Sequence, residues 1–299
     1  MPSGPKKAAF RAMYGRLVEL KEMLSPDTRL VMVTATATKN TIQTVLATLG
    51  TTPDETLLIH RNPVKKNIFY RVRYISKDEP RAVIFNALIE KFKSDKTNLP
   101  RTLIFCPTRQ ICSLLYNTFL IELGETAYCG SKSPENRMVD MYHAGIGDMA
   151  KRHIERAMGI VDHHLKIIIC TIAFGMGIDI RGVHTAIHFG PPGSIEQLMQ
   201  EGGRIGRDGQ PSSNLILFNG YLQMNVESDM RKFLNATSCR REILFSKFNS
   251  DTSDHEIDRG CCCCDICASS CDCGSCRKET LLVNRKRHAE VEPKRRMVS

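Results

Sequence analysis

Residues 166–189 read KIIICTIAFGMGIDIRGVHTAIHF, two apolar runs joined by a glycine-rich turn. The first run, Lys166–Cys170, is continuously apolar after its leading lysine, which is typical of a strand buried on both faces of a parallel sheet. The second run, Val183–Phe189, predicts another buried strand. Pro191-Pro192-Gly193-Ser194 follows it, and a short helical segment is expected from Ser194 onward.

The same alternation extends toward the N-terminus. Arg101–Cys106 predicts a strand followed by a helix to about Leu123, and a short strand is expected near Ala127. Further on, the expected elements are a strand and turn over 141–145, a helix over 148–158 and a last strand over 214–218. Alternating apolar strands and helices predict an α/β fold whose parallel sheet is covered on both faces.

The pattern before this region is different. Helices are expected over 10–24, 39–49 and 82–92, and residues 29–33 read as a buried strand running into Thr34-Ala35-Thr36-Ala37-Thr38. Such hydroxyl residues favour either a ligand site past a strand end or an ordinary helix cap at Thr38. Residues 51–75 read as a connector that ends in an alternating, strand-like segment over 68–75.

The segment Glu201-Gly202-Gly203-Arg204-Ile205-Gly206-Arg207-Asp208-Gly209 predicts an anion site. Glycine allows close approach of the backbone, and arginine supplies permanently charged planar donors that suit phosphate. The alternative is a solvated basic turn; the strand and glycine-rich turn placed before the segment favour the anion site.

Composition limits the class of protein. The chain has 299 residues, 42% hydrophobic and 25% charged, with a net charge of +10. No apolar run approaches the length of a membrane span, so no membrane association is expected. Residues 277–299 hold eight Lys/Arg against three Glu, and they predict a basic disordered tail. A polyanionic partner is therefore favoured.

Nine of the 13 cysteines lie between Cys239 and Cys276. In a chain without a secretion signal, this clustering favours metal over disulfides. Cys261, Cys264 and Cys267 form a Cys-x₂-Cys-x₂-Cys pattern, and Cys239 supplies a fourth thiolate for a tetrahedral structural zinc ion. Cys262 and Cys263 are chemically equivalent candidates, so the register stays open, and no role is assigned to Cys271, Cys273 and Cys276.

These blocks together resemble the motifs of superfamily 2 helicases, and specifically the RecQ family. The resemblance spans about Phe10 to Cys276 in five blocks. They are 34–37 (motif III), 103–106 with Thr108-Arg109 (motif IV), 142–145, 173–179, and 200–209 (motif VI), where the family usually has Ala in place of Ile205. The cysteine segment, with Arg-Arg after Cys239, resembles the RecQ zinc-binding subdomain.

The resemblance implies two RecA-like lobes that sandwich ATP and Mg²⁺ and separate DNA strands. Under it, Arg207 is the arginine finger and Arg204 a second phosphate or coupling contact. DNA-phosphate contacts are expected from Arg109, His143, Arg240 and Arg241, although His143 reads equally well as a satisfied turn residue. Coupling between ATP and DNA is assigned to Thr34, Ala35, Thr36, Gly177, Asp179 and Gln200, with Gln200 and its neighbour Glu201 the weaker assignments.

The domain organisation that follows has five parts. They are a remnant of the first RecA-like lobe (1–50), a connector (51–75), the second lobe (76–220), a helical zinc-binding subdomain (221–278) and the basic tail (279–299). No Gly-x-x-x-x-Gly-Lys-Ser/Thr and no Asp-Glu-x-His box occurs in the sequence. We therefore expect the chain alone to be inactive, either as a fragment of a longer helicase or as a standalone remnant.

The predicted function is part of an ATP-dependent 3′→5′ DNA helicase, and the alternative is a non-catalytic DNA-binding module. The expected partner is single-stranded or forked DNA, bound mainly through its phosphates, and repair or replication proteins are a further class of partner. The basic runs 285–287 and 294–296 resemble a bipartite nuclear import signal, which predicts a nuclear location.

Overall fold

The computed structural model describes residues 17–25, 27–59, 62–174, 178, 180–223, 225–248 and 260–273. Gly177, Asp179, Cys276 and the basic tail, all singled out from the sequence, lie outside these residues. Within them, no helix has the length and apolar character needed to cross a membrane.

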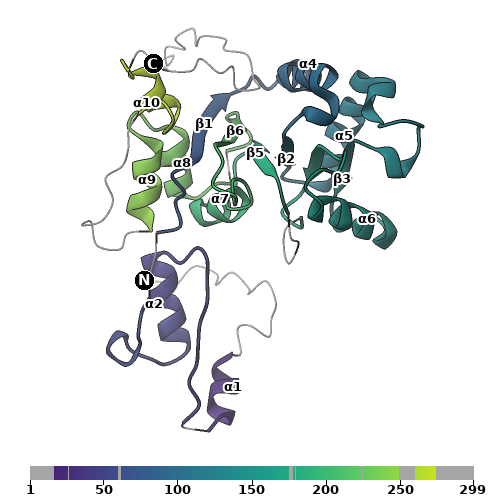
Figure 1. Ribbon diagram of the computed structural model, residues 1–299. Helices are drawn as coiled ribbons and strands as arrows, with labels where there is room; N and C mark the ends of the chain where they lie inside the picture. The colour runs from purple at the N-terminus through teal and green to yellow at the C-terminus, as the bar shows by residue number, and fades with distance from the viewer. Residues whose placement is uncertain are drawn as a thin grey trace, which may run out of the picture.

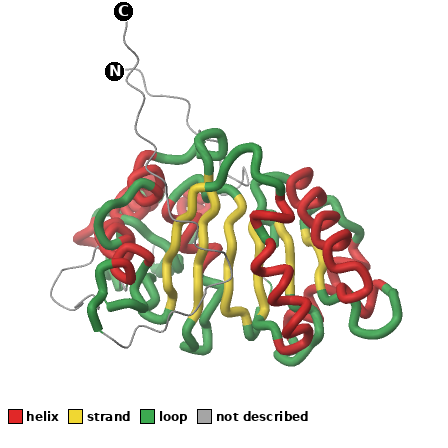
Figure 2. Tube along the Cα trace, turned by 90° about the horizontal axis from the view of Figure 1, so that it is seen from above, coloured by secondary structure: helices red, strands yellow, loops and turns green. Residues whose placement is uncertain are grey.

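The core of the molecule is one six-stranded sheet in which every neighbouring pair is parallel, in the order β1-β6-β5-β2-β4-β3. Figure 2 shows the strands side by side. Their bounds are β1 Ile68–Tyr74, β2 Arg101–Phe105, β3 Val139–Tyr142, β4 Ile167–Cys170, β5 Val183–Phe189 and β6 Ser212–Phe218. The two runs of the opening stretch are β4 and β5, and β2 lies between them. The α/β prediction is confirmed.

Each face of the sheet has its own apolar core. Along β2, Leu103 and Phe105 belong to one cluster, and Ile104 with Cys106, which follows the strand, belongs to the other. This alternation is the period-2 geometry of a strand, which buries successive side chains on opposite faces. The sheet is therefore the middle layer of three.

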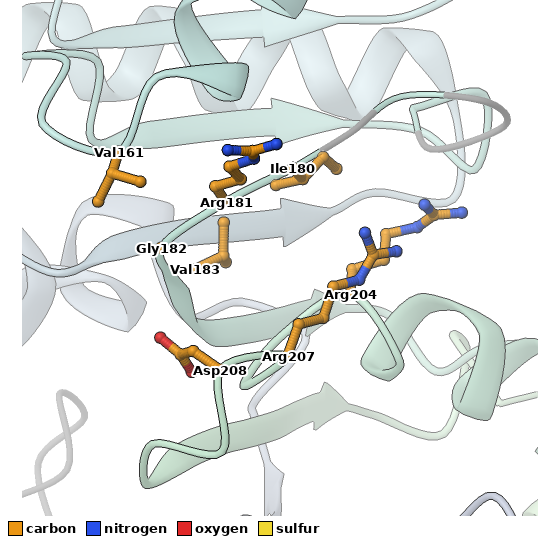
Figure 3. Close-up of a pocket in the computed structure, with 8 residues that line it drawn as sticks. All are labelled: Val161, Ile180, Arg181, Gly182, Val183, Arg204, Arg207 and Asp208. Atoms are coloured by element: carbon orange, nitrogen blue, oxygen red, sulfur yellow. The ribbon is translucent and has the colours of Figure 1, made fainter.

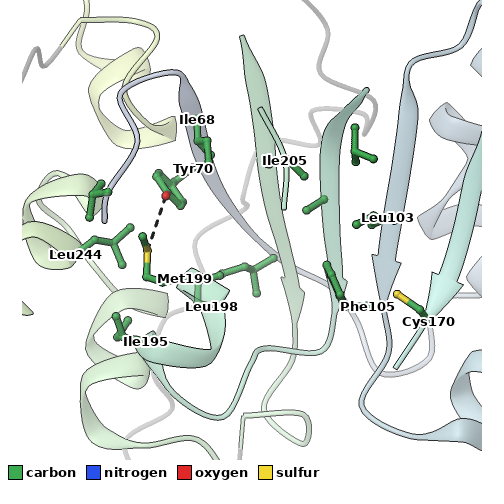
Figure 4. Close-up of a cluster of buried hydrophobic side chains, with 14 of the residues drawn as sticks. Ile68, Tyr70, Leu103, Phe105, Cys170, Ile195, Leu198, Met199, Ile205 and Leu244 are labelled. Atoms are coloured by element: carbon green, nitrogen blue, oxygen red, sulfur yellow. Dashed lines mark hydrogen bonds between the residues drawn. The ribbon is translucent and has the colours of Figure 1, made fainter. Parts of the chain in front are cut away.

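The helices divide between the two faces (Figure 1). One face is covered by α3 (Arg81–Ile84), α4 (Asn86–Asp95) and α5 (Arg109–Leu123). The other is covered by α6 (Asp148–Gly159) and α7 (Ile195–Gly202), together with α8 (Ser228–Leu234) and α9 (Arg240–Lys247). Figure 4 shows part of this second core, where the Tyr70 hydroxyl donates to Met199 Sδ at 3.9 Å.

The cysteine-rich segment packs along the outer side of β1. Cys264 forms a parallel bridge with Tyr70, and Val72 N donates to Asp265 Oδ2 at 3.0 Å. The short helix α10 (Asp265–Ser269) starts at this point. The segment is thus continuous with the sheet and shares the core that contains α8 and α9.

Two expectations about the sheet need correction. Residues 68–74, assigned to the connector, pair with β6 along their whole length, so the lobe begins before Ile68. The strand-like alternation was correct, but it belongs to the sheet. The strand expected near Ala127 is a 3₁₀ turn, Gly124–Ala127, followed by one isolated bridge between Tyr128 and Arg137.

The N-terminal part contains α1 (Leu17–Met23) and α2 (Lys39–Thr48). Thr38 caps α2 by accepting from Thr41 N at 3.2 Å, as its alternative interpretation predicted. The strand expected over 29–33 is wrong: these residues have no regular structure, and the side chains of Val31 and Val33 are 85% and 90% exposed. A strand needs a neighbour for its backbone groups, and no described residue pairs with this run.

Candidate functional site

The loop that follows α7 carries Arg204 and Arg207 and is fixed at the amino end of β5. Gly206 N donates to Val183 O at 2.9 Å. Gly206 has a φ of +56°, and a Cβ there would lie 2.5 Å from Asn67 Nδ2 and 2.6 Å from Ser212 Oγ. Only glycine fits both the backbone angle and the space, so this glycine sets the path that separates the two arginines.

Residues just before β1 hold the same loop from the other side. The Lys65 ammonium donates to Gly203 O at 3.1 Å and to Ile205 O at 3.0 Å. Asn67 Nδ2 donates to Gly206 O at 3.0 Å and to Gln210 O at 2.8 Å. Sequence reasoning missed both residues, because their partners lie about 140 positions away. The pair clamps the arginine loop to the sheet.

Arg204 and Arg207 extend in the same direction from this loop, while Asp208 turns away (Figure 3). Arg204 is buried, and burial followed by the nearby Arg207 charge lowers the pKa of its guanidinium. Arg207 is exposed. Both line a hollow of about 330 Å³, together with Val161, Ile180, Arg181, Gly182, Val183 and Asp208.

Two cations that face one hollow repel each other until an anion joins them. The Nε atom of Arg204 is buried without a hydrogen-bond partner in the structure. Lys65 adds a third positive charge, and burial followed by the Arg207 charge lowers the pKa of its ammonium. Asp208 is the one carboxylate among the lining residues, so positive charge is in excess there, as in binding sites for phosphate or carboxylate groups.

A set of polar side chains inside the protein contacts the helix that precedes the arginine loop. His188 Nδ1 lies 2.9 Å from Glu201 Oε2, and the His188 ring stacks on Phe105 at 5.2 Å between centroids. Gln197 Nε2 donates to Glu201 Oε1 at 2.8 Å. Glu201 is thus fixed inside the molecule, three positions before Arg204, whereas its neighbour Gln200 is exposed.

The structure brings Arg109 and His143 together at the carboxyl ends of β2 and β3. A Cβ on Gly145 would lie 3.3 Å from His143 Nδ1 and 3.5 Å from Arg109 Nη1, so both side chains flank one glycine. Burial, followed by the charges of Arg109 and Lys151, lowers the pKa of His143. Gly145 N donates to His143 Nδ1 at 3.1 Å, which gives His143 a turn role as well. The exposed Arg109 suits a phosphate contact, whereas Nε2 of His143 is buried without a hydrogen-bond partner, so the DNA contact of His143 stays a prediction.

The remaining coupling residues are in different situations. Thr34 and Ala35 are exposed and Thr36 is half-buried in a turn where Thr36 N donates to Thr34 Oγ1 at 3.3 Å. Gly177 and Asp179 are outside the described residues. The coupling roles given to these positions stay predictions.

Arg240 and Arg241 require a correction, because both are buried and make internal contacts. Arg240 pairs with Asp265 at 2.6 Å and donates to Phe233 O at 2.6 Å. Arg241 Nη2 donates to the carbonyl oxygens of Lys66, Ile68 and Cys263. Their donors are directed into the protein, so they anchor the cysteine segment and are not placed for DNA phosphate.

Four buried cysteines, Cys239, Cys263, Cys264 and Cys267, have sulfur atoms within 4.8 Å of one another. Cys263 therefore takes the place predicted for Cys261, which lies in a different group. A hydrogen bond from Cys263, with further ones from the backbone at Cys267 and Arg240, lowers the pKa of Cys264 to about 4. A ready thiolate and four convergent sulfurs fit a tetrahedral, thiophilic metal ion.

Comparison with known proteins agrees with this geometry. Residues 83–209 match the helicase conserved C-terminal domain. The probable ATP-dependent DNA helicase RecS of Bacillus subtilis is 32% identical over 70% of this chain and 37% of its own length. The ATP-dependent DNA helicase RecQ of Pasteurella multocida is 28% identical over 86% of the chain and 39% of its own length.

Solved structures show the same fold. S. cerevisiae Dbp5 L327V bound to RNA and ADP BeF3 superposes with a TM-score of 0.54 at 19% identity, over 76% of this chain and 54% of that one. The first three curated relatives are matched over only 37–45% of their length. The parallel sheet, the arginine loop and these likenesses lead to one assignment: the chain carries a helicase conserved C-terminal domain and belongs to the RecQ family of helicases.

Proposed function

We propose that this chain is the second RecA-like lobe and the zinc-binding subdomain of an ATP-dependent 3′→5′ DNA helicase. One observation carries the proposal: a buried and an exposed arginine share one hollow on a loop that Lys65 and Asn67 hold rigidly. The similarity to relatives that are named DNA helicases supports DNA as the nucleic acid.

The two arginines have different tasks in this proposal. Arg204 is fixed by burial and positions the phosphate chain, whereas the exposed Arg207 reaches the transferring γ-phosphoryl group as an arginine finger. ATP with its Mg²⁺ supplies the reacting phosphoryl group when bound. Because the guanidiniums are preorganised, they stabilise the developing charge without reorganisation at the moment of reaction. Such a finger contributes about 10³–10⁵-fold to kcat.

Arg109 and His143 hold the DNA backbone in this proposal. They lie at the carboxyl ends of β2 and β3, whereas the arginine loop is tied to the amino end of β5. The sheet therefore separates the DNA contacts from the loop that senses the nucleotide. Movement of the lobe during the ATP cycle would carry the DNA contacts with it as one rigid body, which is how strand separation would follow hydrolysis.

Under this proposal the chain alone binds DNA but does not hydrolyse ATP, because its sequence contains neither the phosphate-cradling loop nor the Mg²⁺-binding box. The test is a DNA-stimulated ATPase assay on the purified chain, with fluorescence anisotropy of a labelled single strand. We expect no turnover. Turnover that disappears in Arg207→Ala would overturn the inactivity, and absence of DNA binding would overturn the proposed function.

Arg109→Ala tests the DNA contact directly. If Arg109 neutralises one phosphate, the slope of log K against log salt should fall by about 1 in this variant. Lys91→Ala is the matched control, because Lys91 is an exposed cation on α4, a helix that carries neither Arg109 nor His143. An unchanged slope in Arg109→Ala would remove this residue from the interface.

We also propose zinc as the ion of the Cys239 group and the nucleus as the location of the chain. Four thiolates leave no open position, so this zinc would be structural. The location rests on the basic runs 285–287 and 294–296 alone. A fluorescent fusion of the full chain should accumulate in the nucleus and lose this distribution when both runs are replaced by alanine.

A further inference from the structure

Three cysteines outside the Cys239 group lie together in space. The sulfur atoms of Cys261, Cys271 and Cys273 are all within 4.8 Å of one another, and those of Cys261 and Cys273 are 3.9 Å apart. Two sulfurs on one tetrahedral zinc ion are about 3.8 Å apart when each Zn–S bond is about 2.3 Å. A disulfide would require about 2.05 Å. The spacing is that of two ligands of one ion.

These three sulfurs cannot belong to the ion of the Cys239 group, because four thiolates already complete a tetrahedral coordination. Cys261 and Cys271 are half-buried and Cys273 is exposed. An ion held there would be reachable from solvent, unlike one among the four buried cysteines. Thiolates brought this close repel one another, and a bound cation removes that repulsion.

The chain path explains why these positions converge. Cys261 lies in the turn closed by Cys263 N donating to Gly260 O at 3.0 Å, directly before α10. Cys271 and Cys273 follow the end of α10, where Ser270 N donates to Cys267 O at 3.3 Å. The three cysteines therefore join the two ends of the segment that carries Cys263, Cys264 and Cys267.

We propose that Cys261, Cys271 and Cys273 form a second metal site that takes a thiophilic ion of the zinc class through three thiolates. The ion closes the loop around α10 and is held less tightly than the one in the buried group.

The test is the zinc content of the full chain, purified under reducing conditions and dialysed against metal-free buffer. We expect two ions per chain in the native sequence and one in the double variant Cys271→Ser/Cys273→Ser. Cys129→Ser is the matched control, because Cys129 is exposed and belongs to neither group; it should keep two ions. A far-UV circular dichroism spectrum checks that the variants are folded.

Cobalt substitution gives an independent readout. The double variant should lose about three of seven thiolate-to-cobalt charge-transfer contributions and keep the spectrum of a four-sulfur site. A native chain that holds one ion, also retained by the double variant, would overturn the second site, and so would a Cys261–Cys273 disulfide in the freshly purified chain. One ion that the double variant loses would support the second site and refute zinc in the buried group.

Discussion

Substitution of the buried Arg241 distinguishes an anchoring role of this residue from a DNA-binding role. Its Nη2 donates to Ile68 O at 2.8 Å and to Cys263 O at 3.3 Å, both buried, and to Lys66 O at 3.0 Å. Arg241→Met keeps roughly the length of the side chain and removes all three hydrogen bonds. It therefore removes the Arg241 link between the cysteine segment and β1, while the bond from Val72 N to Asp265 Oδ2 remains.

The size of the effect follows from the two buried acceptors. A hydrogen bond from a charged donor contributes about 1.5–3 kcal/mol. Counting only two bonds at the lower figure gives a loss of about 3 kcal/mol in the free energy of unfolding. For a domain of 150–250 residues, this corresponds to a decrease of about 6–12 °C in Tm.

The assay is thermal unfolding followed by circular dichroism, combined with the salt dependence of DNA binding at a temperature where the variant is folded. Arg231→Met on α8 is the control, because this arginine is exposed and its loss should change Tm by less than 2 °C, the effect of about 0.5 kcal/mol. We expect Arg241→Met to lower Tm and to leave the salt slope unchanged. An unchanged Tm with a slope reduced by about 1 would refute the anchoring role.

Three further predictions concern the loop, the pH dependence and the metal. In urea unfolding, Gly206→Ala should lower the free energy of unfolding by about 2 kcal/mol, because position 206 has a left-handed backbone and a Cβ there would contact Asn67 and Ser212. Gly209→Ala is the control and should lower it by less, because a Cβ at position 209 meets nothing within 4 Å. Burial, followed by the His164 and Arg101 charges, lowers the pKa of His163 from 6.5 to about 4. Between pH 6.5 and pH 4 the unfolded chain therefore binds more protons than the folded chain. The free energy of unfolding should fall by about 1–2 kcal/mol as the pH is lowered from 6.5 to 4, a figure already reduced because His163 is partly exposed. In His163→Gln this decrease should be smaller. Cys263→Ser should release the tightly held ion on dialysis while Cys261→Ser retains it, and the reverse result would restore Cys261 to the four-sulfur group.

Local sequence signals predicted most strands of the sheet, because buried parallel strands have a characteristic apolar composition. β5 begins and ends where the apolar run does, at Val183 and Phe189, and β4 differs from its run by one residue. The run 29–33 has a similar composition and yet forms no strand. The composition of a segment shows that it would suit the interior of a sheet. A strand also needs neighbouring strands to pair with, and the segment's own sequence does not reveal whether these are present.

The candidate site was predicted less completely, for a related reason. The arginine loop could be found because its residues are consecutive, whereas Lys65 and Asn67 reach it from a distant part of the chain. The pair Arg240-Arg241 has the composition of a phosphate contact, and only burial shows its internal role. In the run of four cysteines 261–264, chemistry cannot select the ligands; the direction of each side chain does, and it places Cys263 and Cys264 in the buried group.

The position of the cysteine segment along β1 affects how the protein behaves in solution. β1 ends the sheet, and its outer backbone groups meet Cys263, Cys264 and Asp265 instead of another strand. An uncovered strand edge is a template for pairing with other chains. Loss of the metal would free this edge, so the apo form should aggregate before it unfolds. Metal loading would then protect this edge from pairing with other chains.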